Sequence, residues 1–231
     1  EGIEVRIMDE DGNEQPLGEK GEICVRGENV MVGYWHNEKA TAETLRNGWL
    51  HTGDLGYMDA DGFLYVLGRE KSLLIGNDGE KYSPEAIEEA LTEHSPFIEQ
   101  IMLYNDQSPY TAALLVPNSA QIKRWTESNH IQLDSKEGQD AVLKRLEDEV
   151  AVFQQGGEKE GMFPQRWLPS AIGVLGEGFT EENRFLNSTM KMVRPRITEY
   201  YKNRINYMYT PEGKNICNPQ NRTIVSRLKS E

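Results

Sequence analysis

One stretch of the chain, residues 47–71, holds the side chains with the clearest chemical capacity; it reads NGWLHTGDLGYMDADGFLYVLGREK. Its first part, Trp-Leu-His-Thr-Gly-Asp, is interpreted as a turn, and a hairpin signal follows it. Asp54 comes directly after a glycine, and Arg69 lies fifteen residues later across the expected strand pair. A carboxylate accepts two hydrogen bonds at once, and a guanidinium donates a planar fork. Asp54 and Arg69 can therefore hold the two hydroxyls of a ribose, although an isolated Thr-Gly-Asp would indicate only an aspartate that caps its own turn.

A lysine near the other end of the chain is the second candidate. Lys191 lies in LNSTMKMVRPRI, and segment 189–204 carries five basic residues and one acid in a chain of net charge −13. The acidic balance argues against nonspecific binding of nucleic acid. Local basic density is what a site for phosphate-bearing ligands requires, but a solvated basic helix face would explain the same composition.

The segment up to about Arg69 is expected to be β-rich. IEVRIMD and EICVRGENV alternate apolar and polar residues, and GFLYVLG predicts a further strand. The clusters DEDGN and DADG are typical of hairpin turns, and residues 37–45 predict one short helix. Residues 1–70 are therefore predicted to form a small distorted barrel or sheet.

The following segment, residues 71–210, predicts a compact α+β domain with a central sheet flanked by helices. Ser83 as N-cap and Pro84 at the first helical position mark one helix start. FIEQIMLYND and YTAALLVPN predict two strands joined by a Gln-Ser-Pro turn, and one uninterrupted last helix is expected to begin near Pro195. Residues 211–231 are polar and poorly patterned, which predicts a C-terminal extension. The expected fold class is thus α+β, a β-rich lobe followed by an α+β domain.

Composition narrows the class of protein. The chain has 231 residues, of which 37% are hydrophobic, and no run approaches the ~18 apolar residues of a membrane helix. No secretory leader is visible and the first residue is Glu1, so we expect a cytoplasmic protein and a piece of a longer chain. Cys24 and Cys217 lack a metal-binding spacing, and the four histidines form no close pair in the sequence. We therefore expect no metal site, and Cys24 is expected to be a small core residue.

These motifs, in their order and rough spacing, resemble the AMP-forming adenylating enzymes, which include acyl-CoA synthetases, luciferases and the adenylation domains of peptide synthetases. The resemblance covers nearly the whole chain. It implies that residues 1–70 are the end of the large adenylating domain, that Asp54 and Arg69 bind the ribose of a nucleotide, and that residues 71–210 form a mobile C-terminal domain. Tyr65 either contacts the nucleotide or only packs.

The resemblance also implies roles for the segment after Arg69. Lys71 matches the hinge about which the small domain turns, although a plain linker lysine fits the chemistry as well. Residues 76–81, GNDGEK, match a loop that lines the tunnel for the pantetheine thiol; Gly79, Glu80 and Lys81 would form this thioester face. Gly79 suits a close approach and a positive φ, but an ordinary hairpin turn would show the same pattern.

Lys191 is the catalytic residue that the resemblance implies. Long-chain acyl-CoA synthetases carry a similar Leu-Thr-x-Thr-Met-Lys run, whose lysine bridges the carboxylate and the α-phosphate during adenylation. One ammonium between two anions would stabilise the transition state. The chain departs from the family at Pro195, where relatives often keep a basic residue.

The function implied is that of an ATP-dependent acyl-CoA synthetase, with a fatty acid, ATP and CoA as substrates and Mg²⁺ carried by ATP. The chain shows no phosphate-binding loop, adenine pocket or Mg²⁺ ligands, so it would need the missing N-terminal part of the same chain and be inactive alone. An acyl-carrier protein as acceptor stays open, and peptide-synthetase adenylation domains fit less well. The alternative is a non-catalytic module of this family that binds nucleotide or a carrier protein.

Overall fold

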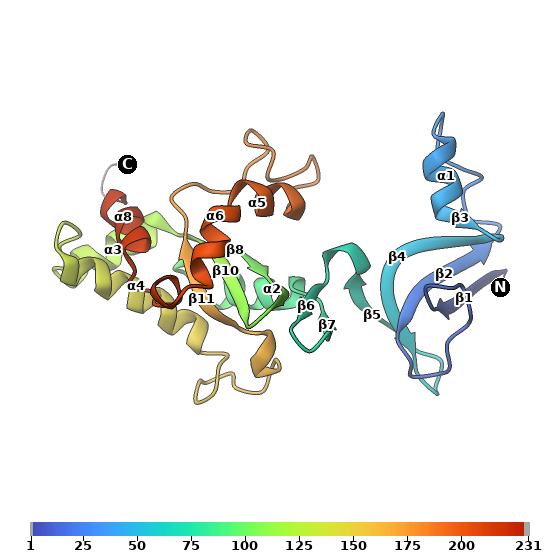
Figure 1. Ribbon diagram of the computed structural model, residues 1–231, viewed down its shortest axis with the longest axis horizontal. Helices are drawn as coiled ribbons and strands as arrows, with labels where there is room; N and C mark the ends of the chain where they lie inside the picture. The colour runs from blue at the N-terminus through green and yellow to red at the C-terminus, as the bar shows by residue number, and fades with distance from the viewer. Residues whose placement is uncertain (1, 229–231) are drawn as a thin grey trace. The chain divides into compact units, whose positions relative to one another are not determined.

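The computed structural model describes residues 2–228 and divides by its internal contacts into two compact units, Glu1–Leu73 and Leu74–Glu231. The two units are described separately below and are coloured blue to teal and teal to red in Figure 1. The division lies just beyond the boundary predicted at residues 70 and 71. The chain is α+β, as the sequence predicts.

The first unit is an antiparallel sheet with one short helix. The sheet order is β1-β2-β4-β3, and β5 pairs with the other part of β4. Helix α1 (Glu38–Thr44) begins after Asn37, whose side chain accepts a hydrogen bond from the Ala40 amide at 3.0 Å. The strands are β1 (Ile3–Met8), β2 (Gly21–Gly27), β3 (Leu45–Arg46), β4 (Trp49–Met58) and β5 (Leu64–Arg69).

A small core lies on one face of this sheet. Met8, Cys24 and Trp49 form it, and Cys24 is fully buried, as expected from its place in an apolar strand. The guanidinium groups of Arg6 and Arg26 lie 5.1 and 4.5 Å from the centre of the Trp49 ring. Two arginine side chains therefore make cation–π contacts with the largest side chain of this small core.

The Trp-Leu-His-Thr-Gly-Asp segment is not a turn; it is the first part of the long strand β4. Strand β4 pairs with β2 on one side and with β5 on the other. The register shifts once in each ladder, between Glu22 and Cys24 of β2 and between Leu55 and Gly56 of β4. Gly53 has φ +72° within this strand. The turn prediction was therefore wrong about the element: pairing with two neighbours keeps this irregular segment in a strand.

The second unit is built on the sheet β8-β10-β11. Strand β10 (Thr111–Pro117) lies in the middle, antiparallel to β8 (Ile98–Tyr104) and parallel to β11 (Pro169–Val174). A smaller sheet contains β6 (Leu74–Gly76), β7 (Lys81–Tyr82) and β9 (Asp106–Ser108). The predicted Gln-Ser-Pro turn is thus partly strand, because β9 finds a parallel partner in β6.

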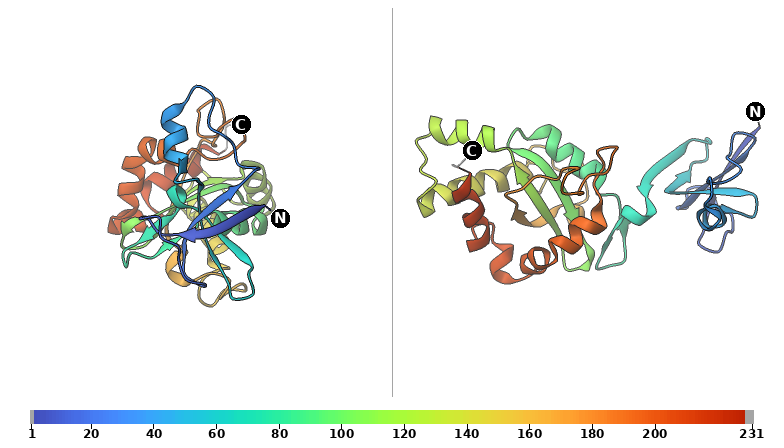
Figure 2. Two further views of the ribbon diagram at one scale, coloured as in Figure 1. Left: turned by 90° about the vertical axis from the view of Figure 1, so that its right-hand side faces the viewer. Right: turned by 90° about the horizontal axis from the view of Figure 1, so that it is seen from above.

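Every residue of β10 is buried, because helices cover both faces of the main sheet. One face packs Ala113 and Leu115 against helices α2, α3, α4 and α8. The other packs Ala112 and Leu114 against α5 and α6. Figure 2 shows α2 and the pair α5–α6 on opposite sides of the strands. The helices are α2 (Glu85–His94), α3 (Ser119–Ser128), α4 (Lys136–Ala151), α5 (Arg194–Tyr200), α6 (Lys202–Met208), α7 (Pro211–Lys214) and α8 (Pro219–Arg227), with 3-10 turns η1 (Glu70–Ser72) and η2 (Gln165–Trp167).

Two predicted helix boundaries differ from the structure. Helix α2 begins at Glu85, and the carbonyl of Pro84 accepts the first amide hydrogen bonds, so Ser83 is not the N-cap. The predicted last helix is interrupted at Tyr201, which separates α5 from α6. The Tyr201 ring lies 5.8 Å from the Phe185 ring, so packing against the preceding loop accompanies the break.

The predicted polar extension is wrong for its described part, residues 211–228. Helix α8 packs on the domain, with Val225 fully buried. Asn221, also fully buried, accepts a hydrogen bond from the Val174 amide at 2.8 Å and donates one to the Ile172 carbonyl at 2.9 Å. These bonds satisfy the edge of β11, so the polar residues that suggested a tail are buried partners of a strand.

Candidate functional site

Asp54 and Arg69, predicted from their spacing, are direct partners across β4 and β5. Arg69 Nε lies 3.2 Å from Asp54 Oδ1, and Arg69 also donates to the Thr52 carbonyl at 3.1 Å. The Arg69 side chain is 63% exposed and the Asp54 side chain is 34% exposed. Both groups therefore have donors and acceptors left for a ligand, while strand pairing holds their backbones in register.

A partly buried carboxylate that the sequence reasoning missed supports the backbone next to this pair. Glu22 on β2 accepts a hydrogen bond from the Gly53 amide at 2.9 Å, next to Asp54. Its other oxygen lies 2.6 Å from His51 Nδ1 and 3.4 Å from Arg46 Nη2. A predicted pairing of β2 with the His-Thr-Gly-Asp segment would have identified Glu22. Cys24 faces His51 in that register, and Glu22 lies two residues before Cys24.

The same cluster bears on the expectation of no metal. One ligand atom each from Glu22, Cys24 and His51 lies within 4.8 Å of the others. Arg46 Nη2 lies 2.7 Å from His51 Nδ1, so the cluster already contains a cation. Burial raises the pKa of the Cys24 thiol to about 11, which keeps it protonated near neutral pH and disfavours its use as a thiolate ligand.

Tyr65 lies near the turn of the β4–β5 hairpin, and the Asp54–Arg69 pair lies at the other end of the ladder. It faces Tyr57 in the β4–β5 register, and the two rings stack with centroids 4.8 Å apart. A hydrogen bond to Asp59, in the turn between the strands, raises the pKa of the Tyr65 phenol. Packing at the closed end of the hairpin accounts for this tyrosine, and a nucleotide contact stays a prediction.

Lys71, the predicted hinge, lies exposed in η1 between β5 and β6. The division between the two units falls between Leu73 and Leu74, directly after this turn. The position fits a linker, and the hinge role itself stays a prediction.

The loop predicted to face the thiol is a tight turn between β6 and β7. The Gly79 amide donates to the Gly76 carbonyl at 2.9 Å, and Gly79 has φ +81°. A Cβ built on Gly79 would meet nothing within 4 Å, so backbone conformation rather than crowding explains the glycine in this structure. Lys81 is exposed on β7, opposite Ile75.

Glu80 ties this loop to a distant part of the chain. Its Oε2 accepts hydrogen bonds from Arg166 Nε at 2.5 Å and from Trp167 Nε1 at 2.9 Å. The Trp167 ring stacks on Tyr82, with centroids 5.1 Å apart. A cavity of about 200 Å³ borders the loop and these aromatic residues. Sequence reasoning placed Glu80 at the loop but did not identify its partners.

Lys191 is exposed on a loop in which one asparagine side chain accepts three hydrogen bonds. Asn187 Oδ1 accepts hydrogen bonds from the Thr189 amide at 3.0 Å, the Thr189 hydroxyl at 2.8 Å and the Lys191 amide at 2.9 Å. Met190, between them, has φ +60°. Within the described chain, the Lys191 ammonium has no carboxylate partner. It is therefore available to an anionic ligand.

A buried ion pair holds the end of this loop. Arg194 donates to both carboxylate oxygens of Glu88, with Nη1 to Oε1 at 3.0 Å, and the Leu103 amide donates to the same Oε1 at 2.6 Å. The Glu88 and Arg194 side chains are 6% and 14% exposed. Burial raises the pKa of Glu88, and Arg194 opposes this effect. Arg194 of the basic run therefore has a structural role.

Two family models match this chain. The model for the AMP-binding enzyme matches residues 1–35, and the model for the AMP-binding enzyme C-terminal domain matches residues 71–147. The chain is 33% identical over 206 residues to the long-chain-fatty-acid–CoA ligase FadD15 of Mycobacterium tuberculosis and 30% identical over 228 residues to the ligase ACSBG1 of Bos taurus. These alignments cover 87% and 90% of the chain but 33% and 30% of the relatives. The chain therefore spans about one third of the relatives' length, and it belongs to the AMP-binding family of adenylate-forming enzymes.

Solved structures agree with this fold. The adenylation domain of a carboxylate reductase from Mycobacterium chelonae matches with a TM-score of 0.71 at 24% identity, over 90% of the chain and 31% of that domain. The o-succinylbenzoate coenzyme A synthetase MenE of Bacillus subtilis, in complex with AMP, matches with a TM-score of 0.55 at 29% identity, over 85% and 33%. In the part of the chain that is described, no helix is both long and apolar enough to cross a membrane.

Proposed function

We propose that this chain supplies the ribose-binding end of the large domain and the mobile C-terminal domain of an ATP-dependent acyl-CoA synthetase whose substrate is a fatty acid. The observation that carries the proposal is the Asp54–Arg69 pair, exposed at the open end of the β4–β5 ladder and backed by Glu22. The similarity to relatives named fatty-acid–CoA ligases supports the reaction class.

The proposed reaction has two steps. A carboxylate oxygen of the acid attacks the α-phosphorus of ATP, the bond from that phosphorus to the bridging oxygen breaks, and pyrophosphate leaves. The sulfur of CoA then attacks the acyl carbonyl carbon, the bond to the AMP oxygen breaks, and the thiol proton passes to solvent. Asp54 and Arg69 would position the ribose through both steps, because the nucleotide stays bound until the end.

Lys191 is proposed to act in the first step only. Its ammonium is exposed and has no carboxylate partner within the described chain, so it is open to an anionic ligand. Placed between the attacking carboxylate and the α-phosphate, it would stabilise the negative charge of the transition state. Lys71 is proposed as the hinge that allows the C-terminal domain to leave after adenylation.

The loop 76–81 is proposed to serve the second step. Gly79 presents no side chain, and Glu80 is already engaged with Arg166 and Trp167. The loop would therefore offer the thiol a backbone surface of fixed shape, with Lys81 exposed beside it. Mg²⁺ would arrive with ATP, and no ligands for it are assigned to this chain.

The test uses the complete enzyme with and without Lys191→Ala. We expect acid-dependent pyrophosphate release, measured across short, medium and long fatty acids, to fall about 100- to 1,000-fold. Thioester formation from acyl-adenylate and CoA should be largely retained. Lys202→Ala, an exposed lysine on α6, is the matched control and should leave both steps unchanged.

Two results would contradict the proposal in different ways. Unchanged pyrophosphate release by Lys191→Ala would remove the lysine from catalysis but leave the family function in place. A wild-type enzyme that binds nucleotide but activates no acid would support the alternative, a non-catalytic module that binds nucleotide or a carrier protein.

A further inference from the structure

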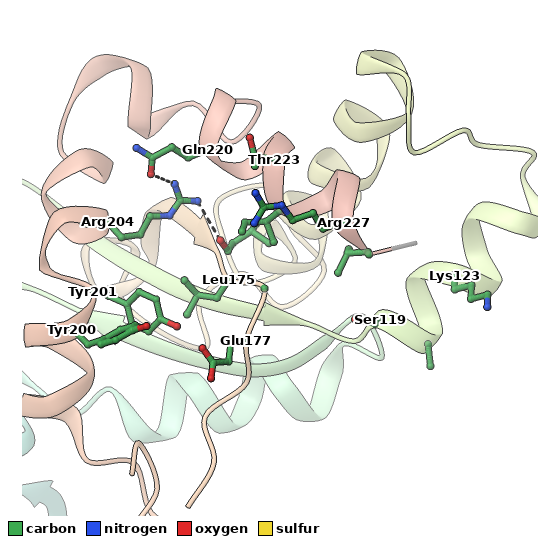
Figure 3. A pocket seen from close by; sticks show the side chains of 15 residues that line it. Ser119, Lys123, Leu175, Glu177, Tyr200, Tyr201, Arg204, Gln220, Thr223 and Arg227 are labelled. Carbon is green, nitrogen blue, oxygen red and sulfur yellow. Dashed lines mark hydrogen bonds between the residues drawn. The ribbon is translucent and has the colours of Figure 1, made fainter. Parts of the chain in front are cut away.

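A large open pocket in the second unit lies apart from every residue discussed above as catalytic. Its volume is about 1,010 Å³, within the usual size of small-molecule sites. Helices α3, α6 and α8 and the end of β11 line it, as Figure 3 shows. The apolar part of its wall includes Leu175, Ile224 and Leu228.

The pocket lies at the opposite end of the sheet from the proposed thioester face. Strands β10 and β11 are parallel. The cavity beside loop 76–81 is lined by Tyr110 and Ser170, at the starts of these strands. The large pocket is lined by Ser119 and Gly176, just beyond their ends. A ligand in it would therefore not occupy the proposed CoA path.

Positive charge dominates the polar part of the wall. Lys123, Arg204 and Arg227 line the pocket, against one acid, Glu177. Within the described residues, none of the three cations has a carboxylate partner. In Figure 3, Arg204 and Arg227 lie at one end of the pocket, and Glu177 lies at the other with Tyr200 and Tyr201.

Arg204 is the most informative of these cations because it is partly buried. It donates to the side chains of Gln220 and Asn221 and to the Val174 carbonyl at 3.2 Å, all of them neutral acceptors. A partly buried guanidinium fixed by neutral groups is oriented but not neutralised. An anion at this end of the pocket would supply the missing charge.

We propose that this pocket binds an amphipathic anion, with a carboxylate or phosphate head group at the Arg204–Arg227 end and an alkyl chain along Leu175, Ile224 and Leu228. The charge on the wall selects the head group, and the apolar surface selects the chain. The proposal does not depend on the proposed catalytic function, because none of the residues assigned to that function lines the pocket.

The experiment is titration calorimetry of the whole chain with four probes below their micelle concentrations: decanoate, decyl phosphate, decanol and decyltrimethylammonium. We expect saturable binding of one decanoate or decyl phosphate per chain and none of the neutral or cationic probe. The stronger of the two anions identifies the head group, a fatty acid or a phosphate ester.

Variants locate the binding. Lys123→Glu/Arg227→Glu should weaken binding of the anions about tenfold or more, as loss of charge-assisted contacts predicts. Arg124→Glu/Lys144→Glu changes the net charge equally at exposed residues outside the pocket and should bind as wild type. Gly176→Leu, which directs a side chain toward Ile224, should block the chain without charge reversal.

Three outcomes overturn the proposal. They are no saturable binding of either anion up to about 1 mM, equal binding of decyltrimethylammonium, and equal effects of the pocket and control charge reversals. Retained far-ultraviolet circular dichroism in each variant separates loss of binding from loss of fold.

Discussion

In the first unit Glu22 bonds to the backbone of Gly53, directly beside Asp54, whereas in the second unit Glu88 holds Arg194, three residues beyond Lys191. Both carboxylates are largely buried, with side chains 15% and 6% exposed. Glu22 therefore supports its candidate residue through one peptide unit. Glu88 fixes only the end of a loop, whereas the Lys191 amide donates to Asn187 Oδ1 and the Lys191 carbonyl accepts from the Asn187 amide.

This difference suits two different tasks. Asp54 and Arg69 are held by strand register and face each other, as a site that keeps one ligand through a reaction requires. Lys191 is on an exposed loop whose end is fixed by the Arg194–Glu88 ion pair. Such a loop suits a group that acts in one step and then withdraws. The predictions below test whether each buried acid supports its site in the way described.

The largest effect is expected for Glu88→Ala. Removal of this acid leaves Arg194 buried without its partner, which should lower the free energy of unfolding by about 3–5 kcal/mol. Urea unfolding followed by circular dichroism measures it. Glu89→Ala, at an exposed position of the same helix, should stay within about 0.5 kcal/mol of wild type. Equal effects of the two changes would show that the pair does not anchor the loop.

A smaller loss is expected for Glu22→Ala. The Gly53 amide loses its acceptor and His51 loses a neighbouring carboxylate, so the free energy of unfolding should fall by about 1–3 kcal/mol. Amide hydrogen exchange at Gly53 and Asp54 should quicken as well. Glu19→Ala, an exposed change shortly before β2, serves as the control. Unchanged exchange at Gly53 would contradict the support assigned to Glu22.

Asn187→Ala should slow adenylation more than thioester formation. It removes three side-chain hydrogen bonds of the Lys191 loop, so pyrophosphate release by the complete enzyme should fall about tenfold, equivalent to ~1.4 kcal/mol. Thioester formation from acyl-adenylate should change little. Ser188→Ala, in the same loop, tests whether any substitution there has this effect. A similar loss in both half-reactions would argue against a role confined to adenylation.

The smallest effect is expected for the ion pair between Asp140 on α4 and Arg222 on α8. Breaking this pair tests whether α8 unfolds together with the rest of the second unit. Hydrogen bonds from Arg222 at 2.6 and 3.0 Å lower the pKa of Asp140 below its ordinary value of 3.8. The pair's stabilisation is thus present above pH 3.8 and is lost as the pH falls through the lowered pKa. Asp140→Asn should lower the free energy of unfolding by about 0.5–1 kcal/mol at pH 7, and the difference should vanish in acid. A difference that persists at the lowest pH would contradict the ion-pair explanation.

Local patterns were sufficient for much of the fold. Alternation predicted β1 and β2, and apolar strand sequences predicted β5, β8 and β10, because side-chain period and turn residues act over a few positions. The same local view failed at the helix break at Tyr201 and at residues 211–228. In both places, contacts with residues distant in sequence decide the structure.

By itself, then, the sequence determined the α+β class, the order of most elements and the Asp54–Arg69 pair, whose residues are joined by a hairpin that the turn cluster DADG specifies. Only the tertiary structure decided which buried groups support these residues. Glu22 meets Gly53, Glu88 meets Arg194, and Asn221 meets β11, across separations of 31, 106 and 47 residues. Such contacts depend on sheet register and helix packing over the whole domain, which no local pattern encodes.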